Sequence, residues 1–240
     1  MRPNIPWIVR HRVLRPEYRY YWLRGTVERD GFKWTTRGLK DGHYAYKEYE
    51  PYLRSYLLSG GHVFVDVGAH VGTWTVRASR VFDKVVAFEP TVETVRVLEK
   101  NLNLNSVTNV TVENVALGDG EGWGVMHKFF SISGGGNTLL ARHPSFPNRT
   151  GEYVNKTDIR KLDSYNLSPD VIKIDTEGYE LRVLEGAKKT LESTGKVVVE
   201  IHAEENLGRA TSLLEENRFK TFIVEDPSKI WPRWLIGEQS

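Results

Sequence analysis

From residue 62 onward, short apolar runs alternate with amphipathic stretches. Several runs are apolar on successive residues, as expected of strands that are covered on both faces. The amphipathic stretches repeat their apolar residues three or four positions apart, which is the spacing of one helix face. This alternation predicts an α/β fold with a doubly wound, mostly parallel sheet. The predicted strands are residues 63–67, 84–88, 110–115, 171–174, 197–201 and 221–224, and the predicted helices include residues 48–58 and 180–193.

The residues before this alternation predict an N-terminal extension over 1–47, followed by a main domain over 48–240. Within the extension, residues 26–29 and 32–35 are typical of two short strands, and they flank Asp30-Gly31. Asp-Gly favours the two-residue turn of a β-hairpin. A hairpin is therefore predicted in the extension.

Residues 118–157 interrupt the alternation with a stretch rich in glycine, serine, asparagine and proline. About 40 residues without a helical pattern are too many for an ordinary connection. We predict an inserted β-hairpin built from residues 123–130 and 138–141, followed by a loop. The insertion leaves the sheet at the edge where a ligand is expected, so it is a candidate lid or acceptor-selecting element.

Composition narrows the class of protein. Apolar residues make up 40% and charged residues 27% of the 240 residues, close to the average of globular proteins. No apolar run approaches the roughly 18 residues that a transmembrane helix needs, and the first residues lack the apolar stretch of a secretory signal. The absence of cysteine excludes disulfides, thiolate metal ligands and thiol catalysis. These features predict a cytoplasmic enzyme or binding protein.

Charge is distributed unevenly, although the net charge is only +2. Residues 1–60 hold 12 Lys and Arg against 6 Asp and Glu, and arginines alternate with Trp and Tyr between Arg2 and Arg24. Such a mixture suits an RNA tether or a peripheral membrane contact, because arginine binds phosphates while the rings stack or enter an interface. The alternative is a helical extension whose rings pack on the body of the protein.

The strand at 63–67 runs into a turn with two glycines, in the segment VDVGAHVGT. Gly68 and Gly72 permit a tight turn and a close approach of a ligand to the backbone. The order differs from G-x-G-x-x-G, since His70 stands where a glycine would admit a pyrophosphate. Asp66 ends the strand, and a carboxylate there suits a ligand with an ammonium group. The turn resembles the first motif of class I S-adenosylmethionine-dependent methyltransferases, which implies cofactor contacts from Asp66, Gly68, Ala69, His70, Gly72 and Thr73.

The next two strands also end in candidate cofactor contacts. Glu89, followed by Pro90, ends the second strand, where an acid can accept hydrogen bonds from ribose hydroxyls. The alternative is a surface carboxylate that precedes the helix starting near Thr91. The third strand ends in ENVALGD, where adenine is expected, so Asn114 and Ala116 are candidate contacts.

Several spaced motifs together resemble the FkbM family of methyltransferases. They are VDVGAHVG, AFEP, ENVALGD, a glycine-rich insertion, VIKIDTEGYE and VVVEIH, and they span roughly residues 48–224. The resemblance implies a Rossmann-like fold, S-adenosylmethionine as methyl donor with S-adenosylhomocysteine as product, and methylation of hydroxyl groups on natural products, sugars or glycolipids. The sequence departs from related loops at His70, where they more often carry Asn. The N-terminal extension lies outside the resemblance.

Ionisable residues gather at the ends of the fourth and fifth predicted strands. Lys173, Asp175 and Glu177 belong to the first of these strand ends, and Glu200 and His202 to the second. Because the carboxyl ends of parallel strands converge on one crevice, we expect these five residues to cluster at the catalytic centre. Buried charges need partners, so Lys173 most simply pairs with one of the acids.

A hydroxyl acceptor needs a base, because a neutral alcohol is a poor nucleophile. His202 is one candidate, since an unperturbed histidine has a pKa of about 6.5. Asp175 or Glu200 would serve if desolvation raised its pKa, and Glu177 is expected to bind the acceptor or orient the base. The structural alternatives are that Glu177 only shapes a turn and that His202 only ends a strand. These residue types also bind divalent cations, but their spacing matches no standard motif, so no metal is predicted.

The sequence thus predicts a methyltransferase acting on an oxygen of a sugar, glycolipid or other small metabolite. Two alternatives remain open: an RNA methyltransferase that uses the basic N-terminus, and a non-catalytic cofactor-binding module. A nicotinamide-dependent enzyme is disfavoured because the pyrophosphate fingerprint is missing. Neither the acceptor molecule nor the oligomeric state follows from the sequence.

Overall fold

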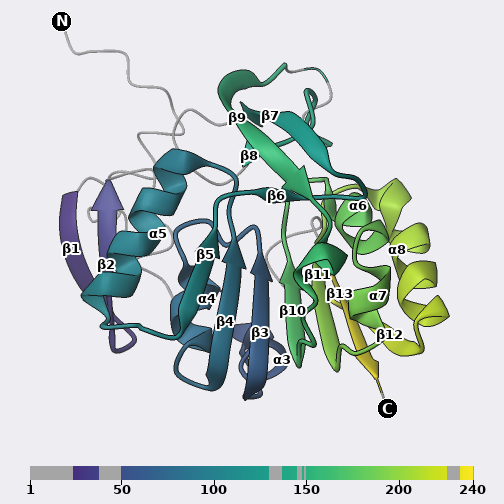
Figure 1. Cartoon of the computed structure of the whole chain (residues 1–240), viewed down its shortest axis with the longest axis horizontal. Coiled ribbons are helices and arrows are strands. Elements are labelled where there is room, and N and C mark those ends of the chain that lie inside the picture. Colours follow the sequence, from purple (N-terminus) through teal and green to yellow (C-terminus); the bar gives the residue numbers. More distant parts are fainter. Residues whose placement is uncertain are drawn as a thin grey trace, which may run out of the picture.

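The computed structural model of the protein describes residues 24–37, 50–129, 137–144, 148, 150–225 and 233–239. Its centre is a seven-stranded sheet with the strand order β12-β13-β11-β10-β3-β4-β5 (Figure 1). Neighbouring strands are parallel except for β13, which runs antiparallel to both β11 and β12. The predicted α/β fold with a mostly parallel, doubly wound sheet is confirmed.

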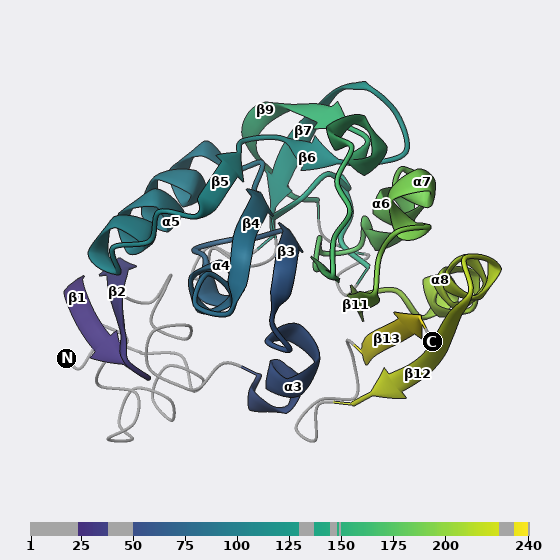
Figure 2. The ribbon, with the colours of Figure 1, turned by 60° about the horizontal axis from the view of Figure 1, so that its bottom comes forward.

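Helices cover both faces of this sheet. Helices α3, α4 and α5 lie on one face and α6, α7 and α8 on the other (Figures 1 and 2), and their apolar side chains pack against the strands. The strands are β3 (Gly61–Val67), β4 (Phe82–Phe88), β5 (Val110–Glu113), β10 (Val171–Ile174), β11 (Lys196–Ile201), β12 (Phe219–Val224) and β13 (Arg233–Gln239). The helices are η2 (Pro51–Leu53), α3 (Arg54–Leu57), α4 (Thr73–Ala78), α5 (Val92–Leu104), η3 (Leu162–Tyr165), α6 (Glu180–Glu185), α7 (Lys188–Leu191) and α8 (Glu204–Glu216).

All six predicted strands are present, and their ends differ from the prediction by at most two residues. The third strand, β5, ends at Glu113, because Ala116 and Leu117 pair with β9 in a second sheet. The sequence does not predict β13, which inserts between β11 and β12. Trp234 and Ile236 of β13 are buried on the face that α3 and α4 cover, so this tail completes the core.

Two predicted helices are shorter in the structure. The helix predicted over 48–58 is limited to the short turns η2 and α3, because Glu50 adopts a left-handed conformation with φ 46° that a helix cannot continue through. The helix predicted over 180–193 is interrupted between α6 and α7. Gly186 lies at this break, and a Cβ placed on it would be 1.9 Å from the carbonyl oxygen of Gly118. Two backbone segments therefore approach each other closely where the helix stops.

The predicted hairpin is formed by β1 (Arg24–Arg29) and β2 (Phe32–Arg37). Asp30 and Gly31 have positive φ values of 52° and 74°, as the predicted type of turn requires. The hairpin lies beside α5 (Figure 2), where Trp34 is buried. Two asparagine side chains accept hydrogen bonds from backbone N–H groups of β2. Asn101 of α5 accepts at 2.7 Å, and Asn105, which directly follows α5, accepts at 2.8 Å. The hairpin is thus fixed to the main sheet through α5.

The insertion forms a second sheet of four strands in the order β6-β9-β7-β8. These strands are β6 (Ala116–Leu117), β7 (Gly122–Lys128), β8 (Asn137–Thr138) and β9 (Glu152–Arg160). The predicted partner of β7, residues 138–141, supplies only part of β8, which pairs with the last two residues of β7. The main partner is the longer β9, which pairs along the whole of β7. Figure 1 shows this sheet above the edge toward which β4 and β5 point.

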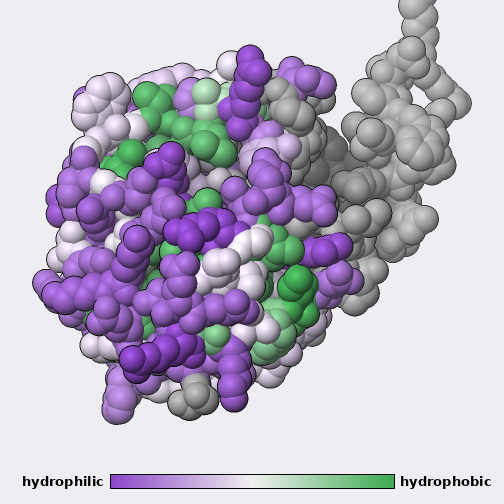
Figure 3. Space-filling model, turned by 90° about the vertical axis from the view of Figure 1, so that its right-hand side faces the viewer, coloured by the Kyte–Doolittle hydropathy of each residue, from purple (hydrophilic) through white to green (hydrophobic). Residues whose placement is uncertain are grey.

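The arginine-rich and aromatic segment before residue 24 lies outside the described residues, so its predicted RNA or membrane contact stays a prediction. Among the described residues, no helix is long and apolar enough to cross a membrane. The side of the molecule that carries α8 is mostly hydrophilic, with small separate apolar patches (Figure 3).

Candidate active site

The glycine turn connects the end of β3 to the end of β4. The backbone N–H groups of Gly68 and Ala69 both donate to the carbonyl oxygen of Phe88, at 2.9 and 3.0 Å. Gly68 has φ 74°, and a Cβ placed on it would lie 1.8 Å from the carbonyl oxygen of Asp175. A side chain at this position would therefore collide with the backbone that follows β10. The turn needs glycine because three strand ends meet there.

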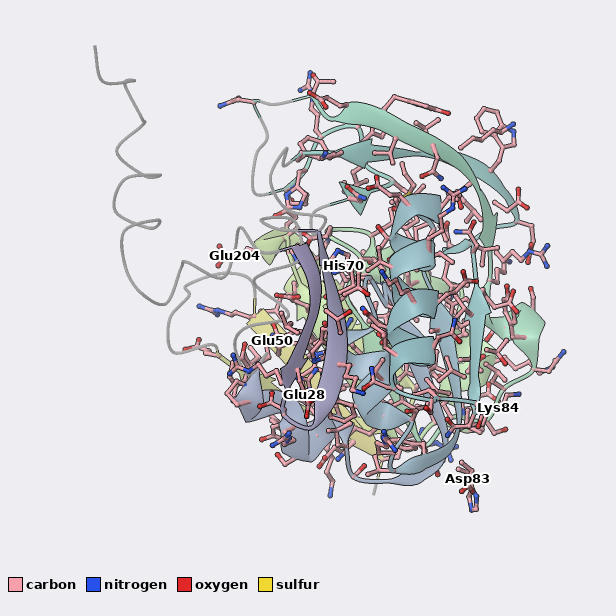
Figure 4. The ribbon with its side chains drawn as sticks, turned by 90° about the vertical axis from the view of Figure 1, so that its left-hand side faces the viewer. Glu28, Glu50, His70, Asp83, Lys84 and Glu204 are labelled. Carbon is pink, nitrogen blue, oxygen red and sulfur yellow. The ribbon has the colours of Figure 1, made fainter. Side chains whose placement is uncertain are left out.

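His70 takes the left-handed conformation inside this turn, with φ 51°. Asn and His are both enriched among non-glycine residues with positive φ, which explains why His can stand where related loops carry Asn. Gly72 also has a positive φ, 86°, and a Cβ on it would lie 2.3 Å from Leu98 of α5. Figure 4 places His70 toward the insertion and Asp83 and Lys84 at the opposite end of the sheet.

The first residue of α4, Thr73, has a buried hydroxyl that makes no hydrogen bond to the described residues. It follows Gly72 directly, so the hydroxyl lies at the end of the glycine turn. Thr73 and the buried Ala69 both have small side chains, so backbone groups of the turn stay accessible to a ligand.

Glu89 follows β4 and is buried. Its Oε2 accepts a hydrogen bond from the N–H of His70 at 3.0 Å, and its Oε1 accepts one from the N–H of Thr91 at 2.9 Å. Burial raises the pKa of Glu89 from its ordinary value of 4.5 to about 7, although these hydrogen bonds and the charge of Lys173 act in the opposite direction. A carboxylate has about four lone-pair positions, so two hydrogen bonds leave acceptor capacity for a ligand.

Of the other predicted cofactor contacts, Pro90 and Asn114 lie next to Glu89, and Ala116 does not. Asn114 Nδ2 donates to the carbonyl oxygen of Glu89 at 2.8 Å, and the carbonyl oxygen of Pro90 accepts from Asn155 Nδ2 of β9 at 3.1 Å. Ala116 lies instead in β6, where it is buried and pairs with Ile159 of the second sheet. The insertion is thus tied directly to the turn after β4.

Lys173 joins the glycine turn to the acids that follow β10. Its buried ammonium nitrogen lies 3.3 Å from Asp66 Oδ1, 3.4 Å from Asp175 Oδ2 and 3.3 Å from the carbonyl oxygen of Gly68. Burial alone would lower the pKa of Lys173, but the charges of Asp175 and Asp66 outweigh it and raise the pKa. The other carboxylate oxygen of Asp66 accepts from Thr75 Oγ1 at 2.6 Å. Lys173 therefore has the predicted acidic partner, Asp175, and a second one in Asp66.

His202 lies between carboxylates. Its Nε2 is 3.2 Å from Glu177 Oε2 and 3.9 Å from Glu200 Oε2, and its Nδ1 is 3.0 Å from Glu180 Oε1. Burial would lower the pKa of His202, but the charges of Glu177 and Glu180 outweigh it and raise the pKa well above 6.5. The pKa of His202 is therefore not the ordinary value that the sequence reasoning assumed, because the ring holds its proton more tightly, and its role as the base stays a prediction.

Glu177 lies in a turn and not on an extended strand, since β10 ends at Ile174 and Glu177 has φ 54°. Its Oε2, which is paired with His202, also accepts a hydrogen bond from His143 Nε2 at 2.9 Å. Burial would raise the pKa of Glu177, but the positive His202 and the hydrogen bond from His143 lower it. The side chain is 26% exposed, so Glu177 is an ionised carboxylate that water or a ligand can reach.

The pKa values of the remaining two acids shift in opposite directions. Burial and the nearby charge of Asp175 raise the pKa of Glu200 well above its ordinary value. Burial would raise the pKa of Asp175, but Lys173 and His202 lower it, as does a hydrogen bond with Glu200. Asp175 therefore gives up its proton more readily than Glu200 does.

Ligand atoms of Asp175, Glu200 and His202 lie within 4.8 Å of one another, a spacing that is compatible with a divalent cation. Within this cluster, Lys173 pairs with Asp175 at 3.4 Å and His202 Nε2 lies 3.9 Å from Glu200 Oε2. The cluster is therefore held together by its own ion pairs.

The structure adds three residues that the sequence reasoning did not assign to the site: His143, Glu180 and Glu50. His143 comes from the insertion, and no local pattern marks it. Glu180 is fully buried and accepts from the N–H of Gly178 at 2.7 Å, and an acid at the start of a predicted helix was the only signal. Glu50 is buried, and its charge acts on both Lys173 and Glu200.

Comparisons with known proteins agree with this geometry. A family model described as the methyltransferase FkbM domain matches residues 66–221, more than half of the chain. The hexuronic acid methyltransferase AglP of Haloferax volcanii is 30% identical over 167 residues, which cover 68% of this chain and 65% of AglP, slightly less than two thirds of its length. Methyltransferase 1 of Beauveria bassiana is 26% identical over 185 residues, covering 68% of this chain and 74% of that protein.

Solved structures share the fold. The FkbM methyltransferase of Methylobacillus flagellatus matches with a TM-score of 0.54 and 20% identity, covering 78% of this chain and 46% of that chain. An rRNA methylase of Streptococcus thermophilus matches with a TM-score of 0.51 and 14% identity, covering 80% and 97%. At these identities the likeness concerns the class I methyltransferase fold alone. Because the family model extends from Asp66 at the glycine turn to Thr221 in β12, the chain belongs to the FkbM family of methyltransferases.

Proposed function

We propose that the protein transfers a methyl group from S-adenosylmethionine to an oxygen of a sugar or of a sugar-containing small molecule. The observation that carries the proposal is the position of Lys173, which contacts the glycine turn at Gly68 and the acidic cluster at Asp175. A methyl donor held by the turn and an acceptor held by the cluster would therefore lie next to each other.

The residues around the turn fit this cofactor. S-adenosylmethionine, when bound, supplies a methyl group on a positively charged sulfur. Glu89 keeps acceptor capacity for ribose hydroxyls, the hydroxyl of Thr73 is available at the start of α4, and Gly68, Ala69, His70 and Gly72 shape the backbone around the ligand. Asn114 donates a hydrogen bond to the carbonyl oxygen of Glu89, and Pro90, the next residue, accepts one from the insertion. Ala116 is the first residue of β6, and we expect this strand end to lie near the adenine.

Asp66 fits a different role from the predicted contact with an ammonium group. It is fully buried, and its two carboxylate oxygens face Lys173 and Thr75. We therefore assign Asp66 to holding Lys173 in place.

Glu177 is our candidate for the residue that accepts the proton of the acceptor hydroxyl. The acidic neighbours of His202 and the burial of Glu200 raise the pKa of both groups, so each holds its proton more tightly, and Asp175 is paired with Lys173. Glu177 is ionised and partly exposed. Although its pKa is lowered, the hydroxyl proton becomes strongly acidic as the oxygen attacks the methyl carbon, so a weak base is enough. His202 holds Glu177, and Lys173 holds Asp175.

The sugar acceptor is supported by the relative AglP, whose name gives a hexuronic acid as its substrate. The acidic cluster disfavours RNA more strongly than a hexuronic acid, because RNA brings several phosphates toward the ionised Asp175 and Glu177 and a hexuronic acid brings a single carboxylate. The predicted cytoplasmic location belongs to this proposal as well.

The experiment is calorimetric binding of S-adenosylhomocysteine, with NAD as control, to the wild-type protein and to Glu89→Ala. We expect binding of S-adenosylhomocysteine that the variant loses, and no binding of NAD. Methyl transfer from labelled S-adenosylmethionine to glucuronic acid, with glucose and a short RNA as controls, then tests the acceptor class. Wild-type protein that binds NAD and not S-adenosylhomocysteine would overturn the cofactor assignment.

A further inference from the structure

The insertion packs directly on the turn that carries Glu177. Gly178 has φ 104°, and a Cβ placed on it would lie 2.7 Å from Pro144 and 3.0 Å from Leu140. Both residues belong to the segment that follows β8, which we call the β8 segment (residues 139–144). The turn after β10 therefore touches a part of the chain that lies more than thirty residues earlier.

His143 is the polar contact between the β8 segment and the turn. Its side chain is 2% exposed, and its Nε2 lies 2.9 Å from Glu177 Oε2. The imidazole lies against Phe129 on one side, with ring centres 5.5 Å apart, and edge-on to His202 at 6.1 Å. This packing fixes the direction in which His143 presents its nitrogen.

Glu177 depends on such contacts, because its carboxylate has its polar contacts among the described residues with His143 and His202. Its backbone is in a sparsely populated conformation, φ 54°, and its side chain is partly open to solvent. Two histidines, His143 and His202, bind the same oxygen, Oε2. Among the described residues, the other oxygen, Oε1, has no hydrogen-bond partner, so it is the one turned to an acceptor hydroxyl.

We propose that His143 is a positioning residue, which holds Glu177 against His202 and makes the β8 segment part of the active site. The inference rests on the proposed function in giving Glu177 contact with the acceptor. It adds that the insertion is needed for the arrangement of the catalytic acids as well as for the choice of acceptor.

The consequence can be measured at His202 without knowing the acceptor. The charged groups that face His202 are Asp175, Glu177 and Glu180 around β10 and Glu200 on β11, and the ring of His143 faces it from the insertion. Among the acids, Glu177 contributes most to the raised pKa of His202. If His143 no longer holds Glu177, the carboxylate can turn to water, and the pKa of His202 falls.

The test is a titration of the histidine ring nitrogens by NMR, on full-length protein labelled with ¹⁵N-histidine. His143→Phe keeps a ring against Phe129 but has no N–H to donate, and we expect it to lower the pKa of His202 by about one pH unit, a tenfold change in proton affinity. Glu177→Gln removes this charge completely, so it gives the largest fall in the pKa of His202 that the loss of Glu177 can cause. His143→Gln keeps a donor and should retain most of the wild-type value, and His127→Ala, in β7, should leave it unchanged.

Each outcome is decisive for His143. An unchanged titration of His202 in His143→Phe would overturn the proposal, as would a larger fall in His143→Gln than in His143→Phe, since that would indicate a packing role. If His143→Phe does not fold, His143→Ala replaces it. Binding of S-adenosylhomocysteine should persist in all variants. If the wild-type protein did not bind it, the proposed function would be contradicted, but the titration result would remain valid.

Discussion

The two ends of the active site are built in different ways. At the cofactor end, Gly68, Ala69 and Glu89 are held by backbone groups of nearby segments. At the acceptor end, Glu177 and His202 are held by side chains that come from β10, β11 and the insertion. The first end depends on the path of the backbone. The second depends on a balance of charges and protons.

This difference predicts how each end fails. Backbone hydrogen bonds tolerate changes of side chain but not of backbone conformation, so the turn should be sensitive to glycine replacement. A buried cluster of charges should be sensitive to the loss of any one charge, because its former partner is left uncompensated. Lys173 contacts both ends, so its replacement should disturb the cofactor end and the acceptor end together.

Replacing Lys173 by methionine should have the largest effect. The variant leaves Asp66 and Asp175 without their shared cation, and breaking a buried ion pair on one side costs about 3–5 kcal/mol. The measurement is the free energy of unfolding in urea. In the double variant Lys173→Met/Asp66→Asn, one orphaned charge is removed, so part of the loss should be recovered. A loss within experimental error in the single variant would show that the pairs contribute nothing.

Replacing Gly68 by alanine tests the backbone end alone. The new Cβ would meet the carbonyl oxygen of Asp175 and would stand on a residue with positive φ. We expect destabilisation of about 1–3 kcal/mol or more and loss of S-adenosylhomocysteine binding in calorimetry. Gly120→Ala is the matched control, because nothing lies within 4 Å of a Cβ there, and it should change stability by less than about 0.5 kcal/mol. Equal effects of the two variants would refute the role of the turn.

Glu89 links pH to the cofactor end. A carboxyl group with a pKa of about 7 is only about one tenth ionised at pH 6, so affinity for S-adenosylhomocysteine should fall about tenfold between about pH 8 and pH 6. Glu89→Gln should bind more weakly at the higher pH and show no such dependence. Calorimetry at a series of pH values checks this.

The same group affects stability with the opposite sign. Because the folded state raises the pKa of Glu89 from 4.5 to about 7, it holds the proton more tightly than the unfolded state does. The contribution of Glu89 to the free energy of unfolding should therefore decrease as pH rises through this window. Subtracting the pH profile of Glu89→Gln from that of the wild type isolates it, and two parallel profiles would contradict the raised pKa.

The smallest expected effect comes from the contact between the insertion and the cofactor end. Asn155→Ala removes the hydrogen bond to the carbonyl oxygen of Pro90 and should cost about 0.5–1.5 kcal/mol. We also expect a severalfold faster dissociation of S-adenosylhomocysteine in stopped-flow measurements. Tyr153→Ala, an exposed change on the same strand, should alter neither quantity. Identical dissociation rates in both variants would argue that the insertion does not retain the cofactor.

Local patterns predicted much of the sheet, because each strand and each glycine of the turn leaves a signal within a few residues. The runs that became β3, β4 and β11 each hold three or more successive apolar residues, at 63–65, 85–88 and 197–199, as burial on both faces requires. The sequence does not predict β13, because its insertion between β11 and β12 depends on partners that are distant in the chain. The sequence also does not predict that β7 pairs with β9, because β9 is likewise distant in the chain.

The sequence by itself determined the α/β fold, the glycine turn, Glu89 at the end of β4 and the acids after β10 and β11. Each of these follows from periodicity or from a position at a strand end. Only the tertiary structure decided in which direction the pKa of each acid shifts, that Asp66 faces Lys173, and that His143 reaches Glu177. Protonation is set by burial and by neighbouring charges, and those neighbours come from segments that the chain brings together only on folding.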